Sequence, residues 1–108
     1  MVRFFKLNRK RDTWGDYYGE YTLEESEGTM YSFDNIIYFV DKVNNKYVAT
    51  EETSGMKLLE ADTIEEIHNC IKNKINRIKA LLKSDQVINN ITMKNALILS
   101  KKFNEGRY

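Results

Sequence analysis

The feature that most constrains this chain is a stripe of apolar residues with helical spacing between residues 64 and 82. At about 100° per residue its members share one narrow face of a helix. Thr63 and Glu66 form the T-x-x-E pattern of a helix N-cap, and Lys79 and Lys83 near the other end complement the helix dipole. We therefore predict one long amphipathic helix over about 64–83. The stripe consists of Ile64, Ile67, Ile71, Ile75, Ile78 and Leu82.

A three-stranded antiparallel meander is predicted directly before this helix. The strands are expected at residues 36–43, 46–53 and 56–61, where β-branched and aromatic residues are frequent. Turns are expected at Asn44-Asn45, because asparagine tolerates a positive φ, and at Ser54-Gly55. The second turn leads through the third strand into the capped helix.

Two-residue turns would fix the register of this meander. Phe39 is then expected opposite Thr50, and Thr50 opposite Leu59. Neither face of such a sheet is plainly polar, so either both faces are covered or one is a partly apolar surface that binds a partner. One face carries Ile37, Phe39, Val43, Val48, Leu59 and Ala61, and the other carries Ile36, Tyr38, Val40, Tyr47, Ala49, Met56 and Leu58.

The remaining segments complete a fold of the α+β class. Residues 2–7 are predicted to form a further strand, and residues 17–23 could form another. A second helix is predicted in the C-terminal segment 84–108, with Asn90 or Thr92 as its N-cap. We expect one domain that takes in all 108 residues. It would hold an antiparallel sheet of about four strands, the N-terminal strand and the meander, packed by the two helices.

The charged residues are distributed in blocks of opposite sign. Residues 1–11 carry five basic side chains and no acidic one, whereas residues 12–34 carry seven acidic side chains and no basic one. Residues 64–108 are basic again, although the net charge of the whole chain is only +1. Such blocks create a patterned electrostatic field, and fields of this kind steer the approach of charged partners.

No pattern of residues indicates catalysis, a cofactor or a metal site. His68 and Cys70 are the only histidine and cysteine, which are too few for a zinc site, and two residues apart on a helix they point in different directions. The spacing of the carboxylates matches no oxygen-ligand loop, and no Walker A, G-x-S-x-G or G-x-G-x-x-G pattern occurs. We predict a protein that is not an enzyme, with no cofactor and no metal. Cys70 is expected to be partly buried, and His68 to be exposed or to cap a helix.

The acidic block is the leading candidate for a partner-binding surface. Its carboxylates alternate with tyrosine and tryptophan, which are enriched where proteins meet. Two interpretations remain open: an exposed surface that binds a basic region of another protein, or a solvated loop whose aromatic side chains turn inward to complete the core. The candidate residues are Trp14, Asp16, Tyr17, Tyr18, Glu20, Tyr21, Glu24, Glu25, Glu27 and Tyr31.

Nucleic-acid binding is the alternative hypothesis for this chain. The basic residues of segment 3–11 and of the helix at 64–83 could contact phosphates. Asparagines at positions 69, 73 and 76 dilute the charge of that helix. We therefore favour the interpretation that its lysines only solvate its outer face.

The composition of the chain indicates the kind of genome that encodes it. Lysine, asparagine and isoleucine account for 33 of the 108 residues, and proline does not occur. AT-rich codons produce this bias, and in size, composition and layout the chain resembles the small single-domain proteins of phages of low-GC bacteria. Many such proteins bind and block a host protein, including defence proteins.

No apolar window approaches the roughly 18 residues of a membrane span, and the N-terminus lacks the apolar core of a secretory signal. We therefore expect a cytoplasmic inhibitor or adaptor of phage or mobile-element origin.

Overall fold

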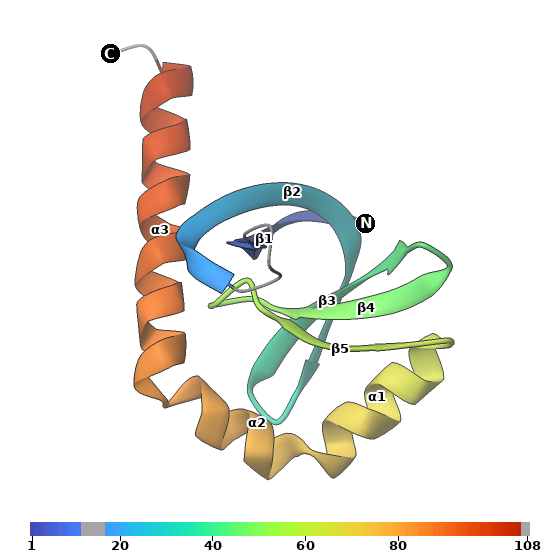
Figure 1. Cartoon of the computed structure of the whole chain (residues 1–108). Helices are drawn as coiled ribbons and strands as arrows, with labels where there is room; N and C mark the ends of the chain where they lie inside the picture. The colour runs from blue at the N-terminus through green and yellow to red at the C-terminus, as the bar shows by residue number, and fades with distance from the viewer. Residues whose placement is uncertain (12–16, 107–108) are drawn as a thin grey trace.

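The protein folds as an antiparallel sheet with three helices (Figure 1). A computed structural model describes the backbone of residues 1–11 and 17–106 and the side chains of residues 1–8 and 21–102. The described strands lie in the order β1-β2-β3-β4-β5. The α+β class predicted from the sequence is confirmed, with five strands instead of about four. The elements are β1 (Val2–Arg11), β2 (Tyr17–Phe33), β3 (Ile36–Val43), β4 (Lys46–Glu51), β5 (Lys57–Ala61), α1 (Ile64–Asn73), α2 (Ile75–Leu82) and α3 (Asp85–Gly106).

The long curved strand β2 gives the sheet its shape. Its first part pairs with β1 up to Gly28, and its last part, from Thr29 onward, pairs with β3. At Gly28 a Cβ atom would lie 2.5 Å from the carbonyl oxygen of Val40 and 3.0 Å from the ring of Phe4. Glycine is required at this position because the two halves of the sheet approach each other too closely for a side chain.

The helices cover one face of the meander. Ile67, Ile71 and Ile78 pack there, and the first two are completely buried. The stripe that the sequence places on one helix face is therefore the core of the protein, as its spacing predicts. Its partners in the sheet are Ile36, Tyr38, Val40 and Ala49.

The folded-back hairpin of β1 and β2 covers the opposite face of the meander. The ring of Phe4 stacks on the ring of Phe39, with centroids 4.7 Å apart and planes inclined by 6°. The N–H of Leu7 donates to the carbonyl oxygen of Gly55 at 2.9 Å, which ties β1 to the turn between β4 and β5. This face is thus covered around Phe39, whereas Ile37 and Val43, towards the ends of β3, are exposed.

The predicted register of the meander is right for one strand pair and wrong for the other. Asn44 and Asn45 form the expected turn, each with a positive φ, and Phe39 lies opposite Thr50. The partner of Leu59 is Ala49, not Thr50, because the ladder between β4 and β5 shifts between Ala49 and Thr50. A shift of one residue turns a strand over. As a result, Leu59 and Ala61 lie on the helix-covered face, not with Phe39.

The single helix predicted at 64–83 is in fact two helices separated at Lys74. The N–H of Lys74 bonds the carbonyl oxygen of Cys70 at 3.0 Å, and its own carbonyl oxygen accepts the N–H of Ile78 at 2.9 Å. Both bonds span four residues, as in a helix, but the backbone of Lys74 has φ −109° and ψ 14°, which is not helical, so Lys74 ends α1 and begins α2. The break leaves the spacing of the apolar residues unchanged, so the periodicity of the sequence does not reveal it. At the start of α1 the predicted cap is confirmed, because the hydroxyl of Thr63 accepts the N–H of Glu66 at 3.1 Å.

The C-terminal helix α3 begins earlier than the sequence predicts. Ser84 precedes its first turn, where its hydroxyl oxygen accepts the N–H of Val87 at 3.4 Å and its carbonyl oxygen accepts the N–H of Ile88 at 3.0 Å. Asn90 and Thr92, the predicted caps, lie inside the helix. Figure 1 shows α3 along one side of the sheet, with its C-terminal end beyond the strands. No helix within the described part of the chain has the length and apolarity needed to cross a membrane.

Candidate functional site

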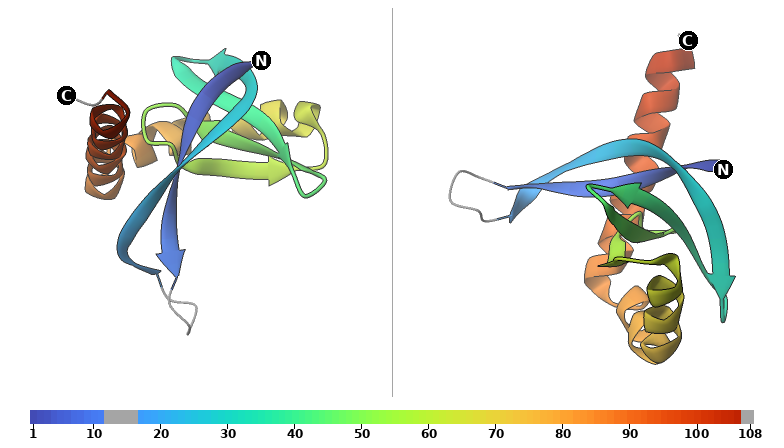
Figure 2. Two further views of the ribbon diagram at one scale, coloured as in Figure 1. Left: turned by 90° about the horizontal axis from the view of Figure 1, so that it is seen from above. Right: turned by 90° about the vertical axis from the view of Figure 1, so that its right-hand side faces the viewer.

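Three of the ten candidate partner-binding residues, Tyr17, Tyr18 and Glu20, lie in the distal part of the β1–β2 hairpin. The register places Arg9 opposite Tyr21 and Arg11 opposite Tyr17, on either side of the segment 12–16. Over these residues β2 pairs with β1, and its pairing with β3 starts only at Thr29. Figure 2 shows this two-stranded ribbon projecting away from the meander and the helices in both views. We call the backbone of residues 9–11 and 17–20 the distal ribbon.

The candidate residues fall into several places in the structure. Trp14 and Asp16 lie outside the described residues, as do the side chains of Tyr17, Tyr18 and Glu20, although the backbone of these three belongs to the distal ribbon. Tyr21, which pairs with Arg9 next to the distal ribbon, is partly buried and lines a cavity of about 420 Å³. Among the remaining candidates, Glu24, Glu25 and Glu27 further along β2 are exposed, and Tyr31 belongs to a different cluster beside α1.

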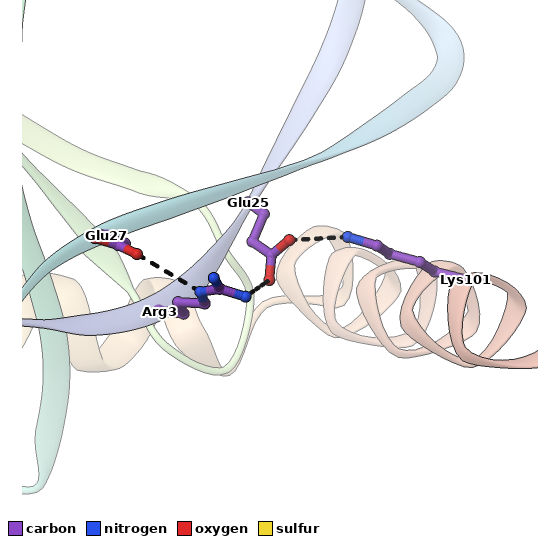
Figure 3. Close-up of polar contacts among 4 residues, drawn as sticks. All are labelled: Arg3, Glu25, Glu27 and Lys101. Carbon is purple, nitrogen blue, oxygen red and sulfur yellow. Dashed lines mark hydrogen bonds and ion pairs between the residues drawn. The ribbon is translucent and has the colours of Figure 1, made fainter. Parts of the chain in front are cut away.

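Two of the acidic side chains on this hairpin, those of Glu25 and Glu27, are paired with basic ones. Arg3 Nη1 lies 3.9 Å from Glu25 Oε1, and Arg3 Nε lies 3.6 Å from Glu27 Oε1 (Figure 3). Lys101 from α3 donates to Glu25 Oε2 at 3.0 Å, and this bond holds the pKa of the Glu25 carboxyl below its ordinary value. The two charge blocks of the sequence thus face each other across the hairpin, and Glu25 and Glu27 are partly neutralised by their neighbours.

A buried ion pair beneath the hairpin joins it to the meander. Lys6 Nζ on β1 lies 2.5 Å from Asp41 Oδ2 on β3, and the hydroxyl of Ser26 donates to the same oxygen at 2.9 Å. The side chains of Lys6 and Asp41 are only 12% and 8% exposed. The sequence does not reveal this pair, because residues 35 positions apart show no local signal of their contact.

The histidine lies in a cluster of aromatic residues between β2, β3 and α1. The hydroxyl oxygen of Tyr38 lies 2.6 Å from His68 Nδ1, and the ring of Tyr31 packs edge-on against the imidazole with centroids 4.4 Å apart. Burial raises the pKa of the Tyr38 hydroxyl, so this group stays protonated. His68 is therefore a partly buried packing residue, not an exposed or capping one, and Cys70 is partly buried as predicted. Within the described residues, no three histidine, cysteine, aspartate or glutamate side chains are grouped as a metal site requires.

Several basic residues of the nucleic-acid hypothesis have partners inside the protein. Arg3 and Lys6 pair with carboxylates in the hairpin. Lys79 Nζ lies 2.5 Å from Asp34 Oδ2. Lys74 and Arg77, on the helices, line a cavity of about 320 Å³ whose other walls are mainly apolar. Because these cations are divided among separate contacts, they give weaker support to a phosphate-binding surface than their number in the sequence suggests.

Comparison with protein-family models, with curated proteins and with solved structures gave no significant match for this chain.

Proposed function

We propose that this chain is a non-enzymatic protein-binding protein whose contact surface is centred on the distal ribbon. The observation that carries the proposal is the projection of this ribbon from the body of the protein (Figure 2). Among the described strands, the backbone of the distal ribbon pairs only within itself. A two-stranded ribbon is only marginally stable in water, so a partner that adds a strand would stabilise it.

The chemistry of the ribbon and its connecting segment suits protein recognition. This stretch holds Trp14, Tyr17 and Tyr18, with Tyr21 at its base. Tryptophan and tyrosine supply large contact areas and dominate the energetics of many interfaces. The unpaired edges of a ribbon can also accept an extended segment of another protein as a further strand.

The ion pairs within the hairpin change the role that the sequence assigns to its glutamates. Glu25 and Glu27 have basic partners in the same chain, so they attract a basic partner less than free carboxylates would. We therefore assign affinity mainly to the aromatic residues of the ribbon, and we assign the steering of a host protein with a basic surface to Asp12, Asp16, Glu20 and Glu24. Action in the cytoplasm as an inhibitor or adaptor of phage or mobile-element origin is part of the proposal and rests on the size, composition and layout of the sequence.

The test is affinity purification with quantitative mass spectrometry from the lysate of a low-GC bacterium. The tagged protein is compared with the Tyr17→Ala/Tyr18→Ala variant and with Met30→Ala as matched control. Met30 lies on the same strand and is 55% exposed, but it is beyond Gly28 and away from the distal ribbon. Circular dichroism must show that both variants are folded.

We expect the tyrosine variant, and not the control, to lose the captured partner. With the purified partner, loss of one hot-spot tyrosine should raise Kd about 30-fold, which corresponds to about 2 kcal/mol. Equal capture by wild type and the tyrosine variant would overturn the assignment of the surface. Retardation of duplex DNA that weakens steeply with added salt and is lost in an Arg9→Gln/Lys10→Gln/Arg11→Gln variant would instead support the nucleic-acid alternative.

A further inference from the structure

The outward face of α3 carries a second stripe of regularly spaced residues, separate from the face that packs on the protein. The six positions follow one another at steps of three, four, three, four and three. At about 100° per residue they lie within an arc of about 100° on the helix surface. All six side chains are exposed, with Ile88 at 49% and Leu99 at 67%. The stripe consists of Asp85, Ile88, Thr92, Asn95, Leu99 and Lys102.

This stripe lies on the opposite side of α3 from the residues that hold the helix to the body. Val87 and Asn90 are buried, and the ammonium group of Lys94 donates to the carbonyl oxygen of Glu52 in the turn after β4. Further along, Lys101 bonds Glu25 on β2. Figures 1 and 2 show the described strands on one side of α3, so that its other side forms the margin of the molecule.

The order of residues in the stripe is complementary to itself in the antiparallel direction. Read from its start, the stripe is acidic, apolar, polar, polar, apolar and basic. When a second copy of the helix runs the other way, Asp85 meets Lys102, Ile88 meets Leu99 and Thr92 meets Asn95. Every charged residue then faces the opposite charge, and every apolar residue faces an apolar one.

We propose that the outward face of α3 binds the same face of a second copy of this chain, antiparallel and about a two-fold axis. Steps of three and four residues are the spacing of a coiled-coil seam, in which side chains from two helices interdigitate. A two-fold axis makes each contact occur twice, so the pair of helices has two charged layers, two apolar layers and two polar layers. The polar layers at Thr92 and Asn95 fix the register at some cost in affinity. Association is therefore weak and depends on protein concentration.

Sedimentation velocity on the full chain, up to about millimolar concentration, measures this association. Asp85→Lys alone and Lys102→Asp alone each turn two attractive contacts into two repulsive ones. Because exposed ion pairs contribute little individually, we expect each variant to raise Kd about tenfold through the two contacts together. An equimolar mixture of the two single variants should associate again as a heterodimer, because every charge on one helix then meets the opposite charge on the other.

The recovery in the mixture distinguishes a contact between copies from damage to the helix itself, which mixing does not repair. A wild-type protein that stays monomeric at the highest concentration would overturn the proposal, as would a mixture that associates no better than its two components. The inference does not depend on the function proposed for the distal ribbon. Tyr17→Ala/Tyr18→Ala is expected to leave the self-association unchanged.

Discussion

The buried ion pair of Lys6 and Asp41 allows a quantitative test of how the hairpin is held to the meander. Lys6→Met keeps most of the apolar stem but leaves the carboxylate of Asp41, which is 8% exposed, with the hydroxyl of Ser26 as its remaining hydrogen-bond donor. Removing one partner of a buried pair costs about 3–5 kcal/mol, against about 5–15 kcal/mol for the free energy of unfolding of a small domain. With an m-value of about 1.5 kcal/mol/M, the urea midpoint should fall by about 2–3 M.

The chain provides a matched control for this experiment. Lys46 Nζ lies 2.6 Å from Asp62 Oδ1, which is nearly the distance in the buried pair. The side chains of Lys46 and Asp62, however, are 49% and 69% exposed. Lys46→Met should therefore shift the urea midpoint far less than Lys6→Met, because water already screens this pair. The double variant Lys6→Met/Asp41→Leu should recover most of the lost stability, since it leaves no buried charge without a partner. Equal midpoints for Lys6→Met and Lys46→Met, or a double variant no more stable than Lys6→Met, would refute the reasoning.

Three further substitutions test other parts of the structure. Gly28→Ala should lower the free energy of unfolding by about 1–3 kcal/mol, because the new Cβ would lie 2.5 Å from the carbonyl oxygen of Val40. An unchanged Tm in a thermal melt would contradict this close approach. Ile71→Ala should lower the free energy of unfolding, measured with urea, by about 2–5 kcal/mol, since Ile71 is fully buried. A variant that unfolds like the wild type would show that Ile71 is not a core residue. Lys101→Met should raise the pKa of Glu25, which the bond from Lys101 lowers. In wild type the stability that Glu25 contributes is present above its ordinary pKa and is lost as pH falls through the lowered folded value. Lys101→Met should therefore lose less stability on acidification, and a side-chain carboxyl NMR titration in which the pKa of Glu25 does not move would contradict the assignment.

The parts of the fold that depend on local chemistry could be predicted from the sequence. The cap at Thr63 and the turn at Asn44-Asn45 depend on residues at most three positions apart. The isoleucine stripe identifies a core face because helical spacing alone brings its members together. The opposing charge blocks are read directly from the sequence, but the sequence leaves open whether the aromatic residues near them face solvent or the core.

The candidate site depends on contacts between distant parts of the chain. The sequence shows no partner for Glu25 and Glu27, but in the structure Arg3 of the hairpin pairs with both, and Lys101 of α3 pairs with Glu25. Tyr31 belongs to the acidic block in sequence, but β2 changes partner before it and carries it to the cluster around His68. No spacing rule contains this information, because the strand's curvature decides it.

The sequence by itself determined where most of the helices and strands lie, and the tertiary structure decided which residues face one another. The ladder shift between Ala49 and Thr50, the break at Lys74 and the buried pair of Lys6 and Asp41 are visible only in the folded structure. Lys6 and Asp41 lie on elements far apart in the chain, β1 and β3. Periodicity reports only the preferences of neighbouring residues, so it locates such elements but not the contacts between them.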